Sequence, residues 1–332
     1  MESTDIVTHR IDTPTALIPS MNTETITEIQ PSKSAPLFGF WYVGCESREL
    51  GRGAVKGIVL LGLPIVLCRT AQGAVGAMRD ICPHRGMPLS FGRMQGDCLE
   101  CAYHGWQFDT GGRCRAIPAL IDDSPIRPEK IGIANYPCRE RDGYVGVFVP
   151  DPQRPHQTVP DVPPLPLPSP PDRMIHISTV LNCTIDDGIV GLMDPAHGPF
   201  VHQSSWWRTR GSIHEKAKTF EPIPNGFRMV AHAPSKNSGP YKLLNWFYGG
   251  SPTTTIDFVL PNQRFEFVQL GARFVSTRAT VTPIDEARKL VFVSFGEIVE
   301  SHLALGSADL QSNTATEIRV GDGAHVQHVK LT

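Results

Sequence analysis

Short apolar segments separated by glycine turns dominate the first half of the chain after a polar start. Apolar residues alternate with polar ones or run continuously in each segment, and each segment ends near Gly or Pro. Runs of this length with such ends are typical of β-strands. We expect strands at residues 57–67, 74–79, 98–108 and 144–149. Together they predict a small antiparallel sandwich, with the aromatic residues of 38–42 packed in its core.

The second half of the chain shows the same strand pattern in longer segments. The expected strands are residues 174–182, 226–233, 253–260, 264–270 and 272–282. Turn residues such as Pro261-Asn262 separate them, which favours antiparallel neighbours. A second, sheet-rich domain is therefore expected.

Two segments without strand or helix pattern set the expected domain boundaries. Residues 1–36 are rich in Thr, Ser, Glu and Pro, so we expect a disordered leader, with a partner-binding tail as the alternative. Residues 150–173 contain so many prolines that they favour an extended, semi-rigid linker over an SH3-type ligand. The first domain then covers 37–149 and the second covers 174–332.

Composition and charge exclude several classes of protein. The net charge of −2 and the pI of about 6.6 leave no basic surface of the kind that binds nucleic acid. The longest apolar run, residues 57–68, is broken by Gly62 and Pro64 and is too short to cross a bilayer. Residues 1–25 hold no apolar signal segment, and eight scattered cysteines do not suggest a disulfide framework. We therefore expect a cytoplasmic protein with no membrane or nucleic-acid partner, whose cysteines outside the motif below are reduced and mostly buried.

Two short motifs near the middle of the first domain combine cysteine with histidine. Cys82 and His84 form a Cys-x-His pair, and after sixteen intervening residues Cys101 and His104 form a Cys-x-x-His pair. Each pair offers one thiolate and one imidazole, which suits two irons bridged by sulfide. Neutral imidazoles in place of two thiolates lower the negative charge of such a cluster and raise its reduction potential. These residues predict a one-electron carrier.

The pattern resembles a Rieske [2Fe-2S] site, and Gly86, Gly105 and Trp106 match the Rieske loops as well. The resemblance implies Cys82 and Cys101 on one iron, and His84 and His104 on the other. Met87 stands where Rieske proteins of respiratory complexes have a cysteine, so the site is similar to the oxygenase variety. The alternative is a zinc site, because Cys98 and Cys101 form a Cys-x-x-Cys pair with His104 close behind. The resemblance also implies that residues 114–120 cover the second loop.

A second motif follows the linker. Asp194, His197 and His202 match the Asp-x2-His-x4-His signature of the same oxygenase family. Two histidines and a carboxylate on one face of an Fe(II) ion leave positions open for other ligands. The resemblance implies that His197 and His202 bind a mononuclear Fe(II). It also implies that Asp194 bridges a histidine of this iron and a histidine of the cluster.

The third ligand of the mononuclear iron is the point where the chain departs from the family. Family members supply it, usually as Asp, from a helix after the sheet, and residues 301–332 show no such helix pattern. Glu317 and Asp322 come nearest by distance along the chain, and neither is assigned. Other pocket candidates are aromatic or basic side chains, whereas His176, His214 and His232 are expected at the surface or in packing. These pocket candidates are Phe200, Trp206, Trp207, Arg208 and Arg210 at the mouth, and Phe258, Phe265 or Phe267 on the sheet.

The resemblance implies an α+β fold and an oxygenase function. An N-terminal all-β Rieske [2Fe-2S] domain would precede a catalytic domain whose curved antiparallel sheet wraps around helices. The chain would be the oxygenase component of a system that hydroxylates or oxidatively demethylates a small aromatic or alicyclic substrate. It would use O2 and electrons from an NAD(P)H-dependent reductase, directly or through a ferredoxin, in a head-to-tail homotrimer. The alternative is a Rieske electron-transfer protein whose catalytic half is vestigial.

Overall fold

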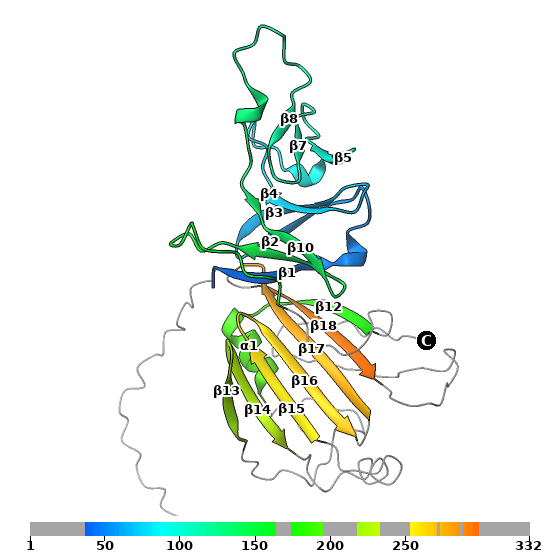
Figure 1. The fold of residues 1–332 in the computed structure, drawn as a ribbon, viewed down its shortest axis with the longest axis vertical. Helices are drawn as coiled ribbons and strands as arrows, with labels where there is room; N and C mark the ends of the chain where they lie inside the picture. The colour runs from blue at the N-terminus through cyan, green and yellow to red at the C-terminus, as the bar shows by residue number, and fades with distance from the viewer. Residues whose placement is uncertain are drawn as a thin grey trace, which may run out of the picture. The chain divides into compact units, whose positions relative to one another are not determined.

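The computed structural model describes residues 37–163, 174–194, 218–232, 253–270, 273–285 and 288–298. The expected leader at 1–36 and the last part of the expected linker, 164–173, lie outside these ranges. Within them the chain is built from antiparallel sheets and one α-helix (Figure 1). This agrees with the predicted α+β class and with a sheet-rich second half.

Three small antiparallel sheets occupy residues 40–149, where one sandwich was expected. The first has the order β1-β11-β10, the second β2-β3-β4-β9, and the third β5-β6-β7-β8. Single-turn 3-10 helices lie at Ser47–Glu49, Leu89–Phe91 and Pro128–Lys130. The strands are β1 (Phe40–Glu46), β2 (Val55–Leu60), β3 (Leu63–Arg69), β4 (Val75–Arg79), β5 (Arg93–Gln95), β6 (Cys98–Glu100), β7 (Gln107–Asp109), β8 (Cys114–Ala116), β9 (Asn135–Tyr136), β10 (Cys138–Arg141) and β11 (Tyr144–Val149).

Two predictions of a single strand were wrong, because the structure has two antiparallel strands in each of these segments. The run 57–67 is the hairpin β2–β3, whose turn residues Leu61 and Gly62 have φ of 54° and 75°. Positive φ at both central residues is the mark of the tight turn that matches strand twist. The run 98–108 is β6 and β7, and the loop between them carries Cys101 and His104.

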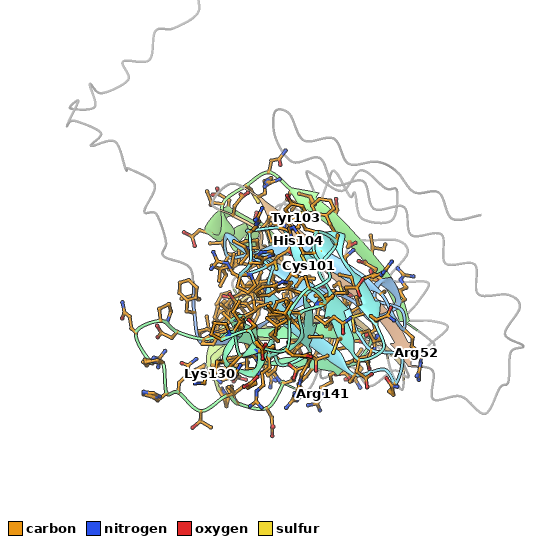
Figure 2. All side chains as sticks on the ribbon, turned by 90° about the horizontal axis from the view of Figure 1, so that it is seen from above. Arg52, Cys101, Tyr103, His104, Lys130 and Arg141 are labelled. Carbon is orange, nitrogen blue, oxygen red and sulfur yellow. The ribbon has the colours of Figure 1, made fainter. Side chains whose placement is uncertain are left out.

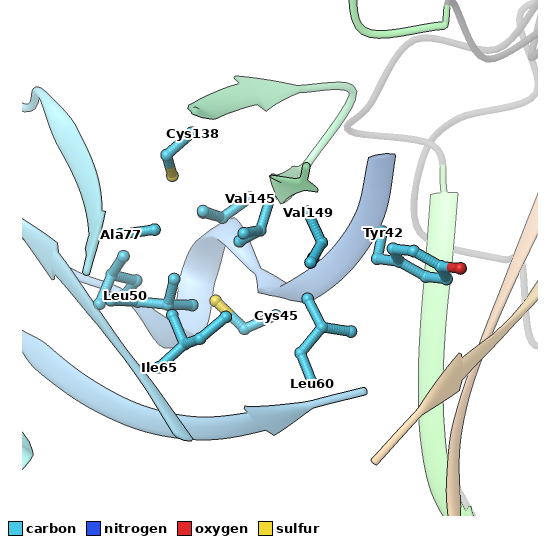
Figure 3. Close-up of a cluster of buried hydrophobic side chains, with 11 residues drawn as sticks. Tyr42, Cys45, Leu50, Leu60, Ile65, Ala77, Cys138, Val145 and Val149 are labelled. Atoms are coloured by element: carbon cyan, nitrogen blue, oxygen red, sulfur yellow. The ribbon is translucent and has the colours of Figure 1, made fainter. Parts of the chain in front are cut away.

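Strand β3 explains why the first half shows a continuous apolar run and little alternation. Ile65 and Leu67 pack into one buried cluster, whereas Val66 and Cys68 pack into another on the opposite side of the strand. A strand covered on both faces has no polar face to show. Figure 3 shows the first cluster, in which residues of the sheet β2-β3-β4 meet residues of β1 and β11. The second hydrophobic cluster includes Cys82 and Cys101. The two loops predicted to hold the [2Fe-2S] group are therefore packed against this core.

The second half forms one sheet of seven strands with the order β12-β18-β17-β16-β15-β14-β13 (Figure 1). Helix α1 (Ile185–Met193) packs against β17, where a Cβ at Gly188 would lie 3.2 Å from Val281 Cγ1. The strands are β12 (Met174–Leu181), β13 (Phe220–Ile223), β14 (Gly226–His232), β15 (Thr253–Val259), β16 (Gln263–Leu270), β17 (Arg273–Pro283) and β18 (Lys289–Ile298). The bounds of β12, β14, β15, β16 and β17 lie within one or two residues of the predicted strands, whereas β13 and β18 were not predicted.

The register of this sheet separates the three phenylalanines considered for the substrate pocket. Phe258 pairs with Arg264, whereas Phe265 pairs with Asp257 and Phe267 with Thr255. Directly paired residues share a face and neighbours along a strand alternate, so Phe258 lies on the opposite face from the other two. One cavity cannot be lined by all three side chains.

Hydrogen bonds connect the small sheets to the large one. Thr282 Oγ1 donates to the Val43 carbonyl over 3.0 Å. The Leu61 and Gly62 amides donate to the carbonyls of Pro283 and Ile284 over 2.9 and 2.7 Å. The end of β17 therefore meets both β1 and the β2–β3 turn. Within the described ranges, no helix has both the length and the apolar character needed to cross a bilayer.

Candidate metal centre

The two loops that carry the cysteine and histidine pairs have the same backbone plan. In the first, the Cys82 amide donates to the Met87 carbonyl over 2.8 Å and the Gly86 amide donates to the Cys82 carbonyl over 2.9 Å. In the second, Cys101 donates to Trp106 over 2.8 Å and Gly105 to Cys101 over 3.0 Å. Both glycines have positive φ, 72° and 70°, which other residues adopt only with strain.

The repeated plan brings like side chains together. The Cys82 and Cys101 thiols lie close enough to interact, and this interaction helps to raise the pKa of Cys82. The imidazole rings of His84 and His104 meet edge to face, with their centroids 4.5 Å apart. The thiols are buried, with 2% and 3% of each residue exposed, whereas His104 lies at the surface (Figure 2). The site therefore has a buried thiol side and an imidazole side that reaches solvent.

Each imidazole rests against an aromatic ring from the second loop. His84 stacks on Trp106 with the centroids 4.7 Å apart and the planes 5° apart. Tyr103 lies 3.8 Å from the His104 ring at an angle of 37°. The sequence singled out Trp106 as part of the motif, and the contact between Tyr103 and His104 was not anticipated. Both aromatic rings fix the direction of the neighbouring imidazole.

The state of the donor atoms fits a metal group at this place. His84 Nδ1 is buried and has no hydrogen-bond partner, which is costly unless something binds it. Burial raises the pKa of the Cys82 thiol to about 11, although the nearby backbone of His84 and Arg85 opposes this. A bound cation removes that penalty because it stabilises the thiolate. Desolvation, together with the charges of His84 and Arg85, lowers the pKa of His104 and favours the neutral imidazole that binds metal.

The arrangement favours a pair of cysteines and a pair of histidines as ligands over a zinc site that uses Cys98, Cys101 and His104. Cys98 lies in β6 opposite Asp109, and Cys101 follows that strand. Three residues of extended chain span about 10 Å, and side chains three apart point to opposite faces. Cys98 and Cys101 therefore do not form the tight Cys-x-x-Cys turn that a shared zinc ion requires. In the described part of the chain, no three or more His, Cys, Asp or Glu gather around one point that could hold a single metal ion.

Neighbouring residues hold the loops in place. Asp80 follows β4 and accepts hydrogen bonds from the Ser90 amide and hydroxyl over 2.7 and 2.6 Å, which ties the two ends of the first loop together. A Cβ at Gly105 would come within 3.1 Å of the Pro118 ring. Pro118 thus lies against the second loop, where residues 114–120 were expected. Of the six other cysteines, Cys45, Cys68, Cys114 and Cys138 are buried free thiols, as expected.

The second predicted motif is described only at its first residue. Asp194 follows α1, and its amide donates to the Val190 carbonyl over 2.8 Å. Thr184 caps the other end of the helix by accepting a hydrogen bond from the Asp187 amide over 3.2 Å. The remaining members of the site lie outside the described residues, so their assembly stays a prediction. These are His197 and His202, the unassigned acids Glu317 and Asp322, and the pocket candidates Phe200, Trp206, Trp207, Arg208 and Arg210.

Comparison with known families defines the first half of the chain. The family model for the Rieske [2Fe-2S] domain matches residues 40–137, which include both loops. These residues form a Rieske domain, the class of domain that holds a [2Fe-2S] cluster. The resemblance stated from Cys82, His84, Cys101 and His104 is confirmed at the level of the domain.

Curated relatives that match part of the chain are named as oxygenases. Chlorophyllide a oxygenase of Chlamydomonas reinhardtii is 34% identical over 175 residues, which are 52% of this chain and 25% of that protein. The oxygenase component of dicamba O-demethylase from Stenotrophomonas maltophilia is 38% identical over 112 residues, 34% of this chain and 32% of the relative. The chain thus spans a quarter to a third of the length of these curated relatives. By this comparison, the chain carries a Rieske [2Fe-2S] domain and is similar, over part of its length, to proteins named as oxygenases.

Solved structures extend the similarity beyond the Rieske domain. NdmA of Pseudomonas putida CBB5 with caffeine superimposes with a TM-score of 0.65 at 21% identity, covering 78% of this chain and 74% of that one. Dicamba monooxygenase bound to dicamba gives a TM-score of 0.60 at 21% identity, covering 78% and 76%. At this level of identity the likeness shows a shared fold, and it includes the large sheet as well as the small ones.

Proposed function

We propose that the chain is the oxygenase component of a Rieske-type system that hydroxylates or oxidatively demethylates a small aromatic or alicyclic molecule. The observation that carries the proposal is the pairing of two buried thiols with two imidazoles, one of which has an unpartnered buried Nδ1. Relatives named as an oxygenase and an O-demethylase, and the shared fold with two demethylating or monooxygenating proteins, support the reaction class.

The four loop residues divide between two irons in this proposal. Cys82 and Cys101 would hold one iron, and His84 and His104 would hold the other. The bound cluster supplies storage for one electron at a higher potential than four thiolates would allow. The nearby backbone of His84 and Arg85 lowers the pKa of the Cys82 thiol and would stabilise added negative charge there. His104, at the surface, gives the electron a short way in or out.

The second half would hold a mononuclear iron. His197 and His202 are the proposed ligands, and the bound Fe(II) supplies activation of O2 with positions open for substrate-side ligands. Asp194 would accept hydrogen bonds from the ring N–H groups of histidines on both sides and hold them in line. The third ligand remains unassigned, with Glu317 and Asp322 as candidates.

The partners follow from the same proposal. An NAD(P)H-dependent reductase, with or without a ferredoxin, would deliver electrons, and O2 and the organic molecule would be the substrates. A head-to-tail homotrimer would place the cluster of one subunit near the mononuclear iron of the next. We keep the cytoplasm as the predicted location.

Replacing Asp194 tests the link between the two centres. Asp194→Asn keeps the size of the side chain and removes its charge, so the absorbance of the cluster should persist while product formation falls at least tenfold. Product is measured by mass spectrometry with labelled O2 on a panel of aromatic and alicyclic compounds. Asp186→Asn, at an exposed position in the first turn of the same helix, is the matched control and should keep the activity. Full turnover by Asp194→Asn would remove Asp194 from the electron path.

Metal analysis separates the oxygenase from an electron carrier with a vestigial second half. The tail after residue 298, which lacks the family's helix pattern for the third ligand, favours keeping this second candidate. Three irons per chain support the oxygenase, whereas two irons with two sulfides and no oxygen-dependent product support the carrier. A colourless protein that contains zinc would exclude both.

A further inference from the structure

A small cavity lies where the Rieske domain meets the seven-stranded sheet. Residues of β1, β10 and β11 line one side, and residues of β16 and β17 line the other. Its free volume is about 30 Å³, which is room for one or two water-sized groups and far too little for an aromatic ring. The cavity is therefore too small to be the pocket for the proposed organic substrate.

Arg278 of β17 is the unusual residue of this cavity. Only 4% of Arg278 is exposed, and its Nε and Nη1 atoms are buried without any hydrogen-bond partner. Its guanidinium carbon lies 4.9 Å from the centre of the Tyr144 ring, so an aromatic face covers one side. Desolvation lowers the pKa of Arg278 to about 10, which still leaves the group charged at neutral pH. A buried cation with two unused donors is costly unless an anion accepts from them.

Another arginine on the same face of the sheet has the carboxylate partner that a partly buried guanidinium usually has. Arg228 of β14 pairs with Asp257, and both oxygens of that carboxylate accept from the guanidinium over 2.7 and 2.8 Å. This fork-to-fork geometry is the strongest pairing that arginine makes. Arg228 has this partner although 41% of its side chain is exposed. Arg278, which is far more buried, has no carboxylate within hydrogen-bonding distance of Nε or Nη1.

The remaining charges around the cavity also favour an anion. Arg139 and Arg141 line it together with Arg278, and Asp142 is the one acidic residue in the lining. Asp142 interacts with Arg141, whose Nε lies 3.5 Å from the carboxylate, and the charge of Asp142 also acts on Arg278. Three positive groups against one negative group leave a net positive lining.

We propose that this cavity binds one small carboxylate anion of the size of formate on the Nε and Nη1 atoms of Arg278. Two carboxylate oxygens match the two free donors of the guanidinium fork and fit the available volume. The anion would replace the partner that Asp257 provides to Arg228. It would also join the Rieske domain to the large sheet, because Arg278 and Tyr144 come from opposite sides of the cavity.

Thermal unfolding of the full-length holoprotein tests the site with formate as the probe. Formate replaces a bulky sulfonate buffer salt at constant ionic strength, so that general salt effects stay equal. We expect the midpoint of unfolding to rise by about 2–4 °C and to level off as the site fills. The same rise should occur in Arg228→Met, the matched control, and should be absent in Arg278→Met.

A direct binding measurement covers the case in which Arg278→Met does not fold. Carbon-13 formate should show line broadening with the wild-type protein, and an excess of unlabelled formate should reverse it. Arg278→Lys, which keeps the charge and loses the fork, should weaken formate binding at least fivefold. An equal midpoint rise in Arg278→Met would overturn the site, as would formate that neither broadens nor stabilises the wild type. The latter result would assign the counter-charge to the protein itself.

Discussion

At the scale of single residues, the imidazoles of the candidate centre are held from one side only. Trp106 stacks on His84 and Tyr103 packs on His104, while the Nδ1 atom of His84 is left without a protein partner. The rings are thus oriented before any metal binds, which limits the rearrangement needed when an electron arrives.

Replacing one imidazole by a thiolate tests its contribution to the potential. His84→Cys should still assemble a coloured cluster, and its reduction potential should fall by about 200 mV or more, towards the range of all-cysteine clusters. The measurement is a spectroelectrochemical titration. His156→Cys, at an exposed histidine outside both loops, should leave the potential unchanged. An unchanged potential in a fully loaded His84→Cys protein would show that His84 is not a ligand.

The ion pair between Arg69 and Glu140 gives a prediction about pH. Arg69 is almost fully buried and donates to both Glu140 oxygens over 2.6 and 2.9 Å, and these bonds lower the pKa of Glu140 from its ordinary value of 4.5. Such a group adds stability above its unfolded pKa and loses it as the pH falls through the folded pKa. Because 39% of the Glu140 side chain is exposed, solvent screens the pair, and Glu140→Gln should lower the free energy of unfolding by about 0.5–1.5 kcal/mol at pH 7, with a smaller difference from the wild type below pH 4.5.

Denaturant unfolding at several pH values measures that difference. Glu221→Gln is the control, because half of the Glu221 side chain is exposed and its oxygen lies 3.9 Å from Arg228 Nη1. Its effect should stay within about 0.5 kcal/mol. A Glu140→Gln protein whose deficit does not shrink in acid would contradict the role given to the ion pair.

At the scale of elements, the two loops depend on glycines with left-handed backbone. Gly105 combines a φ of 70° with the nearby Pro118 ring, so a methyl group there meets both strain and a tight contact. Gly105→Ala should cost about 1–2 kcal/mol of loop stability and reduce the iron and sulfide content of the purified protein. Gly51→Ala is the control, since its Cβ would have nothing within 4 Å and its φ is not left-handed. Wild-type cluster loading in Gly105→Ala would show that the loop tolerates the strain.

The elements also show how far the sequence alone could lead. Strands such as β11 and β15 were predicted almost to the residue, because they are short apolar runs with clear turn residues at their ends. The run 57–67 was wrong because a turn at Leu61 and Gly62 can hide inside apolar sequence when both strands are buried. The face of the sheet on which Phe258 lies could not be predicted from the sequence either, because it depends on the register between paired strands.

The candidate site and the cavity also contain residues that the sequence could identify and a residue that it could not. Four ligand candidates could be identified from Cys82 to His104, because cluster ligands sit in local motifs whose spacing appears in one chain. Arg278 gave no such signal, because nothing around it in the sequence Ser-Thr-Arg-Ala reveals that β17 places it under Tyr144. Burial that depends on contacts between distant segments cannot be read from neighbours along the chain.

At the scale of the whole molecule, the Rieske domain and the large sheet share the end of β17. Thr282 and the residues that follow it bind β1 and the β2–β3 turn through backbone carbonyls and amides. These bonds join the part that would store the electron to the part that would use it. In the proposed homotrimer, these hydrogen bonds would hold the two halves of each subunit in one fixed arrangement relative to the neighbouring subunits.

Everything proposed for the whole molecule depends on a cluster with mixed cysteine and histidine ligands. Electron–nuclear double resonance of the reduced protein, prepared with nitrogen-15 histidine, measures this ligation most directly. We expect strong couplings to two histidine nitrogens in the wild type, and loss of one coupling in His84→Cys. A reduced cluster without any histidine coupling, or a colourless protein without a paramagnetic signal, would contradict the assignment of Cys82, His84, Cys101 and His104.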